Sequence, residues 1–142
     1  MSGHLFFADR YLGYDDALYA AVRLIELVAS ESGPLSGRLA GLPEVYATPE
    51  LRIFCEDERK FDVMARVATA QKQRTDVALD AVDGVRITYP DGGWWLLRVS
   101  NTQPALVARV EAKSSARLHE IAAEVAEILG HEEVEFPEWQ EA

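Results

Sequence analysis

Apolar residues recur at helical spacing in two segments of the second half of the chain, residues 57–71 and 114–130. This spacing is typical of a helix that packs one face against other elements. Gly130 ends the second segment. We therefore expect two amphipathic helices with these core-facing side chains: Phe61, Met64, Ala65 and Ala68 in the first, and Leu118, Ile121, Ala122, Val125, Ile128 and Leu129 in the second.

Short apolar runs bounded by turn residues predict strands at 50–55, 77–79, 85–89, 94–99 and 105–112. The turns between the last four runs are short, and a parallel pair needs a long crossover, so we expect antiparallel pairing. Trp94 and Trp95 then point to opposite faces of their strand, and at most one of them faces the helices.

Residues 17–29 predict a further helix, which is apolar around most of its circumference and which Asp15 or Asp16 can cap. Its only charges are Arg23 and Glu26, a pattern typical of a helix buried on several sides. We expect a short strand at 5–9 before this helix.

The chain has 142 residues, 49% of them hydrophobic, and a formal net charge of −10. The acidic balance argues against nucleic acid or an anionic membrane as a partner. No apolar run is long enough for a membrane span, so we expect a water-soluble, cytoplasmic protein. The single cysteine, Cys55, is expected to be a buried small hydrophobe, and the three histidines show no metal-ligand spacing, so we assign no metal to this chain.

Residues 98–104 put a guanidinium, two hydroxyls and an amide at the end of an apolar strand. Arg98, Ser100, Asn101 and Thr102 offer a bidentate cation and several donors to one anion, which suits a phosphoryl group. The alternative is an ordinary polar turn that Pro104 closes. Residue types alone do not separate the two interpretations.

Several motifs, taken in order, resemble the bacterial phosphomannomutase/phosphoglucomutase family of the alpha-D-phosphohexomutase superfamily. They cover nearly the whole chain: Met1-Ser2-Gly3-His4, Gly13-Tyr14-Asp15-Asp16, Thr48-Pro49-Glu50-Leu51-Arg52, Asp57-Glu58-Arg59-Lys60-Phe61, Asp83-Gly84-Val85-Arg86 and Arg98-Val99-Ser100-Asn101-Thr102-Gln103-Pro104. The phosphorylatable serine loop and the metal loop of the family have no counterpart in the sequence. The resemblance implies a C-terminal fragment, the end of the third domain and the fourth domain.

The resemblance implies an α+β fold. We expect a C-terminal domain with a TBP-like, antiparallel sheet of about four to five strands, covered on one face by two helices, after a strand–helix remnant of an α/β domain. The expected divisions are a third-domain remnant at 1–43, a linker at 44–49, a phosphate-binding domain at 50–130 and an acidic tail at 131–142. The tail is expected to be loose, and the alternative is that Phe136 and Trp139 fold back onto the body.

For the parent enzyme the resemblance implies an isomerase, which interconverts hexose 1-phosphate and hexose 6-phosphate of mannose or glucose. The reaction passes through a phosphoserine and a hexose 1,6-bisphosphate, and Mg²⁺ is the implied metal. Arg98, Ser100, Asn101 and Thr102 would bind the substrate phosphate, Ser2 a sugar hydroxyl, and His4 would lie near the reacting oxygens. The alternative for Ser2 and His4 is a chain terminus without a role.

We expect no catalytic centre in this chain, no bound cofactor and no mutase activity of the fragment alone. The expected partners are a phosphorylated hexose, the missing N-terminal domains and, through helix 17–29, a second copy. The rival functions are a stand-alone module that binds a phosphosugar without turning it over and a structural interaction domain.

Overall fold

The computed structural model describes residues 3–30 and 32–141, and it divides the chain into two compact units, Met1–Pro43 and Glu44–Ala142. The first unit holds helix α1 (Ala17–Ala29) and a 3₁₀ helix (Leu35–Leu39). The second unit holds the rest of the elements: β1 (Tyr46–Ala47), β2 (Leu51–Phe54), α2 (Asp57–Gln71), β3 (Ala78–Asp80), β4 (Val85–Thr88), β5 (Trp94–Val99), β6 (Ala105–Ala112) and α3 (Ser115–Gly130).

The strands of the second unit form one antiparallel sheet in the order β1-β6-β5-β4-β3, and β2 also pairs with β6. The predicted antiparallel pairing and the α+β class are confirmed. The sheet has six strands because two short pieces, β1 and β2, share one edge of the long strand β6.

The segment expected as a linker, 44–49, contains part of this sheet. Tyr46 and Ala47 form β1 opposite Ala112 and Glu111. Thr48 follows and is fully buried; its amide donates to the Val110 carbonyl, and its hydroxyl accepts from the Val110 amide. Pro43 and Pro49 therefore lie on either side of a short edge strand. The alternation of polar and apolar residues at 44–49 was too short to predict this strand.

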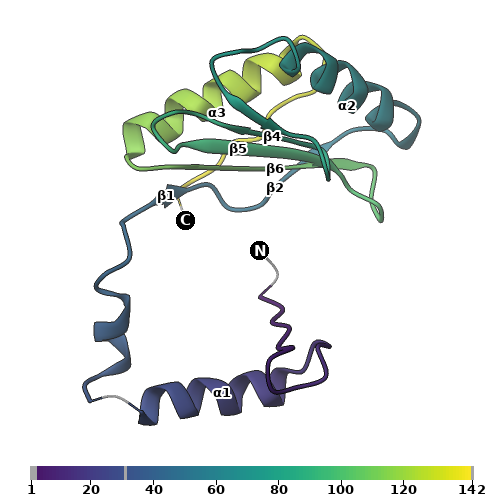
Figure 1. Cartoon of the computed structure of the whole chain (residues 1–142). Helices are drawn as coiled ribbons and strands as arrows, with labels where there is room; N and C mark the ends of the chain where they lie inside the picture. The colour runs from purple at the N-terminus through teal and green to yellow at the C-terminus, as the bar shows by residue number, and fades with distance from the viewer. Residues whose placement is uncertain (1–2, 31, 142) are drawn as a thin grey trace. The chain divides into compact units, whose positions relative to one another are not determined.

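Helices α2 and α3 cover one face of the sheet (Figure 1). The core lies between these helices and the sheet. In it, Trp95 is fully buried and donates its indole N–H to the Tyr89 hydroxyl at 3.2 Å. Trp94 points to the opposite face, as the alternation predicts. The other strand residues in the buried core with Trp95 are Leu51, Ile53, Val85, Ile87, Leu97, Leu106, Ala108, Val110 and Ala112.

The expected apolar stripe of α2 is partly wrong. Phe61 is 60% exposed and Ala65 is also exposed. The helix is turned so that a different stripe faces the sheet, and it includes two polar residues: Lys60, Val63, Met64, Val67 and Gln71. The stripe of α3 agrees with the prediction apart from Ile128, which is only partly buried.

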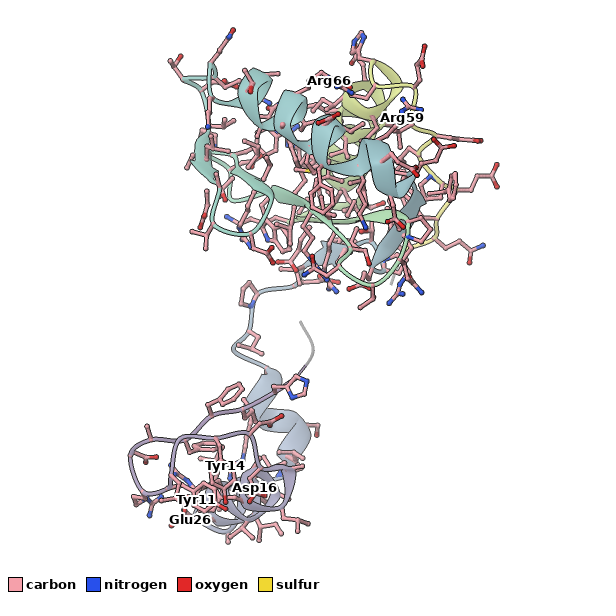
Figure 2. The ribbon with its side chains drawn as sticks, turned by 90° about the vertical axis from the view of Figure 1, so that its right-hand side faces the viewer. Tyr11, Tyr14, Asp16, Glu26, Arg59 and Arg66 are labelled. Atoms are coloured by element: carbon pink, nitrogen blue, oxygen red, sulfur yellow. The ribbon has the colours of Figure 1, made fainter. Side chains whose placement is uncertain are left out.

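The C-terminal tail is attached to the second unit. Arg59 and Arg66 of α2 (Figure 2) hold it: Arg59 donates to the Glu132 carbonyl at 3.0 Å, and Arg66 pairs with the Glu132 carboxylate at 2.6 Å. Val134 is buried, and the rings of Phe136 and Trp139 pack against the core. These contacts disagree with a loose tail and agree with the alternative, in which Phe136 and Trp139 fold back onto the body.

The first unit is built around α1, whose bounds agree with the predicted helix. Asp16 caps α1 by accepting from the Tyr19 amide at 3.0 Å, and it also accepts from the Tyr11 hydroxyl, which lies 2.9 Å from that of Tyr14 (Figure 2). The predicted strand at 5–9 is reduced to a single bridge between Phe6 and Asp15.

The side chains of α1 are not buried in the described chain, contrary to the prediction. Leu18 is 82% exposed and Ile25 is 67% exposed. The described part of the first unit is too small to surround a helix that is apolar on several sides. Among the described residues, no helix is both long enough and apolar enough to cross a membrane.

Candidate functional site

The candidate site begins with Arg98, near the end of β5. Strand alternation buries Leu97 toward the helices and so places Arg98 on the opposite face of the sheet, which no helix of the second unit covers. Arg98 lies opposite Val107 of β6. Among the described residues it makes no side-chain hydrogen bond or ion pair, so its guanidinium retains all its donors.

Gly84 lies directly beside Arg98 and immediately precedes β4. A Cβ atom at this glycine would lie 2.8 Å from the Arg98 Cα and 2.2 Å from the Leu97 carbonyl oxygen. Its φ of +87° is also a conformation that other residues rarely adopt. Only a glycine at position 84 allows its backbone to approach the backbone of Leu97 and Arg98 this closely.

The 100–104 loop joins β5 to β6 and closes on itself through its backbone. The Ser100 amide donates to the Ala105 carbonyl at 2.9 Å, and the Ala105 amide donates to the Gln103 carbonyl at 2.8 Å. The Lys60 ammonium of α2 donates to the carbonyls of Ser100, at 2.8 Å, and Gln103, at 3.0 Å. The loop is therefore fixed at both ends.

The polar side chains of the loop differ in their accessibility. Ser100 is buried, and its hydroxyl accepts from the Thr102 amide at a long 3.4 Å. Asn101 and Thr102 are exposed, and in the described chain their side chains form no hydrogen bond. Arg98, Asn101 and Thr102 thus remain available to a ligand, whereas Ser100 supports the loop in this conformation.

Arg52 is a second guanidinium near the loop. It lies on β2 opposite Val107, the residue that also faces Arg98 across the sheet. Arg52 donates to the Gln103 side chain at 2.7 Å and pairs with Glu50 at 3.2 Å. Its charge is therefore partly neutralised, whereas Arg98 has no carboxylate partner among the residues that the structure describes.

The arrangement can bind an anion. An unpaired guanidinium, an exposed amide and an exposed hydroxyl lie within a few residues of one another, next to backbone amides of Asn101 and Gln103 that have no acceptor among the described residues. Such a set matches the several oxygens of a phosphoryl group. The net charge of −10 does not preclude anion binding here, because such groups act at short range and distant charges are screened.

The sequence and the fold resemble known proteins over the same region. Residues 50–128 match the family model described as "Phosphoglucomutase/phosphomannomutase, C-terminal domain", which is more than half of the chain. The chain belongs to the phosphoglucomutase/phosphomannomutase family.

Curated relatives include the phosphomannomutase/phosphoglucomutase of Pseudomonas syringae pv. tomato, 40% identical over 121 residues, which cover 85% of this chain and 26% of that protein. The phosphoglucomutase of Neisseria gonorrhoeae is 39% identical over 122 residues, with the same two coverages. A solved structure of a family protein from Burkholderia thailandensis superimposes with a TM-score of 0.80 at 36% identity, over 99% of this chain and 28% of that one. The chain spans about a quarter of the length of these relatives.

The other residues expected from the phosphohexomutase resemblance lie in the first unit. Ser2 is outside the described residues. His4 is exposed, and its Nδ1 pairs with the Asp15 carboxylate. Both residues of this pair lie in the first unit, so the contact does not connect His4 to the 100–104 loop.

The described residues do not fit the Mg²⁺ ion implied for the family. No group of three or more His, Cys, Asp and Glu in the described part of the chain lies close enough to hold a metal ion. We therefore assign no step to a metal in this domain.

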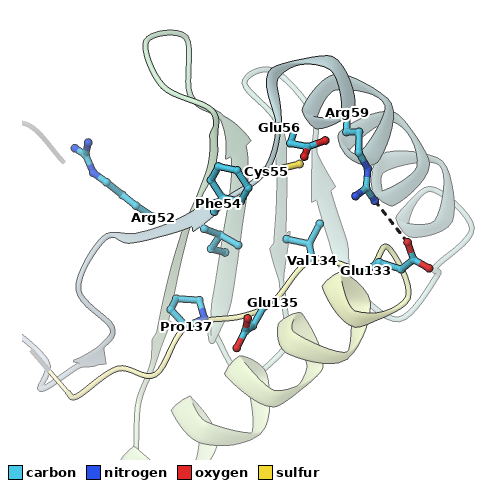
Figure 3. Close-up of a pocket in the computed structure, with 10 residues that line it drawn as sticks. Arg52, Phe54, Cys55, Glu56, Arg59, Glu133, Val134, Glu135 and Pro137 are labelled. Atoms are coloured by element: carbon cyan, nitrogen blue, oxygen red, sulfur yellow. Dashed lines mark ion pairs between the residues drawn. The ribbon is translucent and has the colours of Figure 1, made fainter.

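A pocket of about 530 Å³ lies between β2 and the C-terminal tail of the second unit, and Arg52 is one of its lining residues (Figure 3). Arg59 and Glu133 form an ion pair at 3.9 Å at its side, and Phe54, Cys55 and Val134 contribute to its lining. Burial raises the pKa of the Cys55 thiol, which agrees with the expectation of a small hydrophobe rather than a nucleophile. None of Arg98, Ser100, Asn101 and Thr102 lines this pocket.

Sequence reasoning missed Lys60, Gly84 and Arg52 as parts of the site. All three lie in motifs that resemble the family, but their contacts with β5 and the 100–104 loop join positions far apart in the chain. A lysine within the buried stripe of α2 was the available signal for Lys60, because lysine is almost never buried without partners.

Proposed function

We propose that Glu44–Ala142 is the substrate-phosphate-binding domain of a phosphohexomutase. In this proposal the parent enzyme interconverts hexose 1-phosphate and hexose 6-phosphate of mannose or glucose, through a phosphoserine and a hexose 1,6-bisphosphate. The names of the relatives support the reaction class. The observation that carries the role of this domain is the unpaired guanidinium of Arg98 beside the exposed donors of Asn101 and Thr102.

The proposed task of the site is to hold the phosphate that is not reacting. A planar guanidinium binds two phosphate oxygens at once and so fixes the direction of the sugar as well as its position. Asn101 and Thr102 supply neutral donors to the remaining oxygens. Because either end of a bisphosphorylated hexose carries the same group, one such site can hold the intermediate in both of its orientations.

The alternative is a module that binds a phosphosugar without turning it over. The site geometry supports binding in both cases, since none of its residues needs to act on the phosphoryl group. The two functions differ in whether the domain contributes to turnover when it is joined to the rest of a mutase.

The test is a chimeric enzyme in which residues 44–142 replace the corresponding region of the Pseudomonas syringae relative. The chimera should interconvert glucose 1-phosphate and glucose 6-phosphate, and Arg98→Ala should lower kcat/KM at least tenfold, because charge-assisted hydrogen bonds contribute about 1.5–3 kcal/mol. Arg98→Lys should recover only part of the loss, since an ammonium lacks the planar bidentate geometry.

Arg66→Ala is the matched control, because it removes the same charge from an exposed side chain, paired with the largely buried Glu132, that makes no contact with the 100–104 loop. It should leave kcat/KM within about twofold of the chimera. An active chimera with an unchanged kcat/KM after Arg98→Ala would remove Arg98 from the site. An inactive chimera whose domain still binds glucose 1-phosphate would favour the non-catalytic module.

A further inference from the structure

Lys60 occupies a position that rarely tolerates a charge. It lies in the first turn of α2, on the stripe that packs against the sheet, and it is only 5% exposed. An ammonium in such a place must satisfy all three of its N–H donors within the protein. Its position is therefore determined by its acceptors.

The acceptors of Lys60 match its donors in number. Its Nζ lies 2.8 Å from the Ser100 carbonyl, 3.0 Å from the Gln103 carbonyl and 2.6 Å from the Asp57 carboxylate. Asp57, one turn earlier on the same helix, balances the charge. The other two acceptors are the first and fourth residues of the 100–104 loop, so a single side chain joins both ends of that loop to α2.

This contact also determines which backbone groups of the loop face a ligand. The carbonyl oxygens of Ser100 and Gln103 carry partial negative charge and would repel a phosphate if they were turned outward. Both are occupied by the ammonium, while the amides of Asn101 and Gln103 have no acceptor among the described residues. A loop with its carbonyls inward and free amides is a favourable surface for an anion.

We propose that Lys60 is the positioning residue of the phosphate site: it touches no ligand itself and holds the 100–104 loop in the anion-binding conformation. The proposal rests on the proposed function, because it assumes that Arg98, Asn101 and Thr102 bind phosphate. It gives a residue of α2 a role in a site whose proposed ligand contacts all come from one strand end and its loop.

The test uses the full chain and two variants, Lys60→Met in α2 and Lys72→Met directly after it. Lys72 is exposed and forms no side-chain bond in the described structure, so it controls for the loss of charge. Val63→Ala, a fully buried residue of the same helix, controls for lost stability. Titration with inorganic phosphate at constant ionic strength is followed by the NMR shifts of the amides of 98–103.

Lys60→Met should weaken phosphate binding about tenfold or more, because the loop no longer keeps its carbonyls turned away. Its amides at 101–103 should also exchange faster with water in the absence of phosphate. Lys72→Met and Val63→Ala should bind phosphate within about twofold of the unmodified chain. A folded Lys60→Met chain with unchanged phosphate affinity overturns the proposal, and so does equal weakening by Val63→Ala.

The two readouts separate this proposal from the proposed function. If the unmodified chain shows no phosphate shifts at 98–103, the proposed function fails, and amide exchange alone then decides whether Lys60 holds the loop. If Lys60→Met does not fold, the ¹⁵N-lysine signals of the unmodified chain decide. The Lys60 ammonium should exchange slowly with water, unlike those of Lys72 and Lys113; equal exchange of all three contradicts the contact.

Discussion

At the scale of single residues, the site depends on a few positions with strict requirements. Gly84 is the clearest, because its missing side chain permits the contact with the Arg98 backbone. The motif predicted Arg98, Asn101 and Thr102 as ligand contacts, and the structure leaves their side chains without hydrogen bonds among the described residues. Ser100 was assigned to the ligand from its type and its place in the motif. Its burial within the loop was not predictable, since the direction of a hydroxyl in a turn depends on the neighbouring strands.

Gly84→Ala should destabilise the domain more than Gly92→Ala. Both glycines have a positive φ, +87° and +89°, so both substitutions introduce backbone strain of about 1–3 kcal/mol. At Gly92 the new Cβ meets only the flexible end of Lys113, at 3.0 Å, whereas at Gly84 it meets backbone atoms at 2.2 and 2.8 Å. Urea unfolding of the two variants checks this order. Equal free energies of unfolding would show that the contact at Arg98 relaxes easily.

At the scale of elements, the helices and the strands of the meander follow their predicted segments closely, because turn residues and apolar periodicity act locally. The rotation of α2 about its own axis was not predicted correctly. Phe61 and Val63 are both apolar, and only contact with the sheet decides which of them is buried. The two-residue strand β1 was also unpredictable, because it exists through pairing with β6, more than sixty residues later.

The β4–β5 hairpin is joined to α3 by Asp91, and this gives a pH dependence. Its carboxylate accepts from the Gly93 amide at 2.8 Å and from Arg117 at 2.7 Å. These two bonds, that of Gly93 first, hold the pKa of Asp91 below its usual 3.8. A carboxyl group whose pKa is lower in the folded state stabilises the fold above pH 3.8, and the contribution is lost as the pH falls through the folded-state pKa.

Asp91→Asn should therefore be less stable than the unmodified chain at neutral pH, by about 1 kcal/mol or less because the pair is partly exposed. The difference should vanish in acid, below the folded-state pKa. Asp83→Asn, in the preceding turn, is the control and should show no such trend. Urea unfolding across the acid range makes the comparison. A difference that persists undiminished at the acid end would mean that the charge of Asp91 is not involved.

At the scale of the whole molecule, the two units differ in how well they bury their apolar residues. The second has a continuous core, whereas α1 exposes Leu18 and Ile25. The sequence predicted an apolar helix that needs neighbours on several sides, and periodicity reports what a helix can bury and not which residues cover it. We propose that a second copy covers α1 when the chain is alone in solution.

Light scattering on the full chain and on a chain that begins at Glu44 tests this pairing. The full chain should form dimers at concentrations where the shorter chain is monomeric, because two copies of an apolar helix can bury each other symmetrically. Leu18→Glu combined with Ile25→Glu should return the full chain to the monomer. If the full and the shortened chains are both monomeric at the same concentration, α1 does not mediate association.

The central claim is that Arg98 and the 100–104 loop bind the phosphate of a phosphorylated hexose. The most direct measurement is an NMR titration of the full chain with glucose 1-phosphate, and separately with glucose at the same concentrations. Glucose 1-phosphate should shift the amides of 98–103 and glucose should not, and Arg98→Ala should abolish the shifts. Equal shifts with both sugars, shifts elsewhere only, or unchanged shifts in Arg98→Ala would contradict the claim.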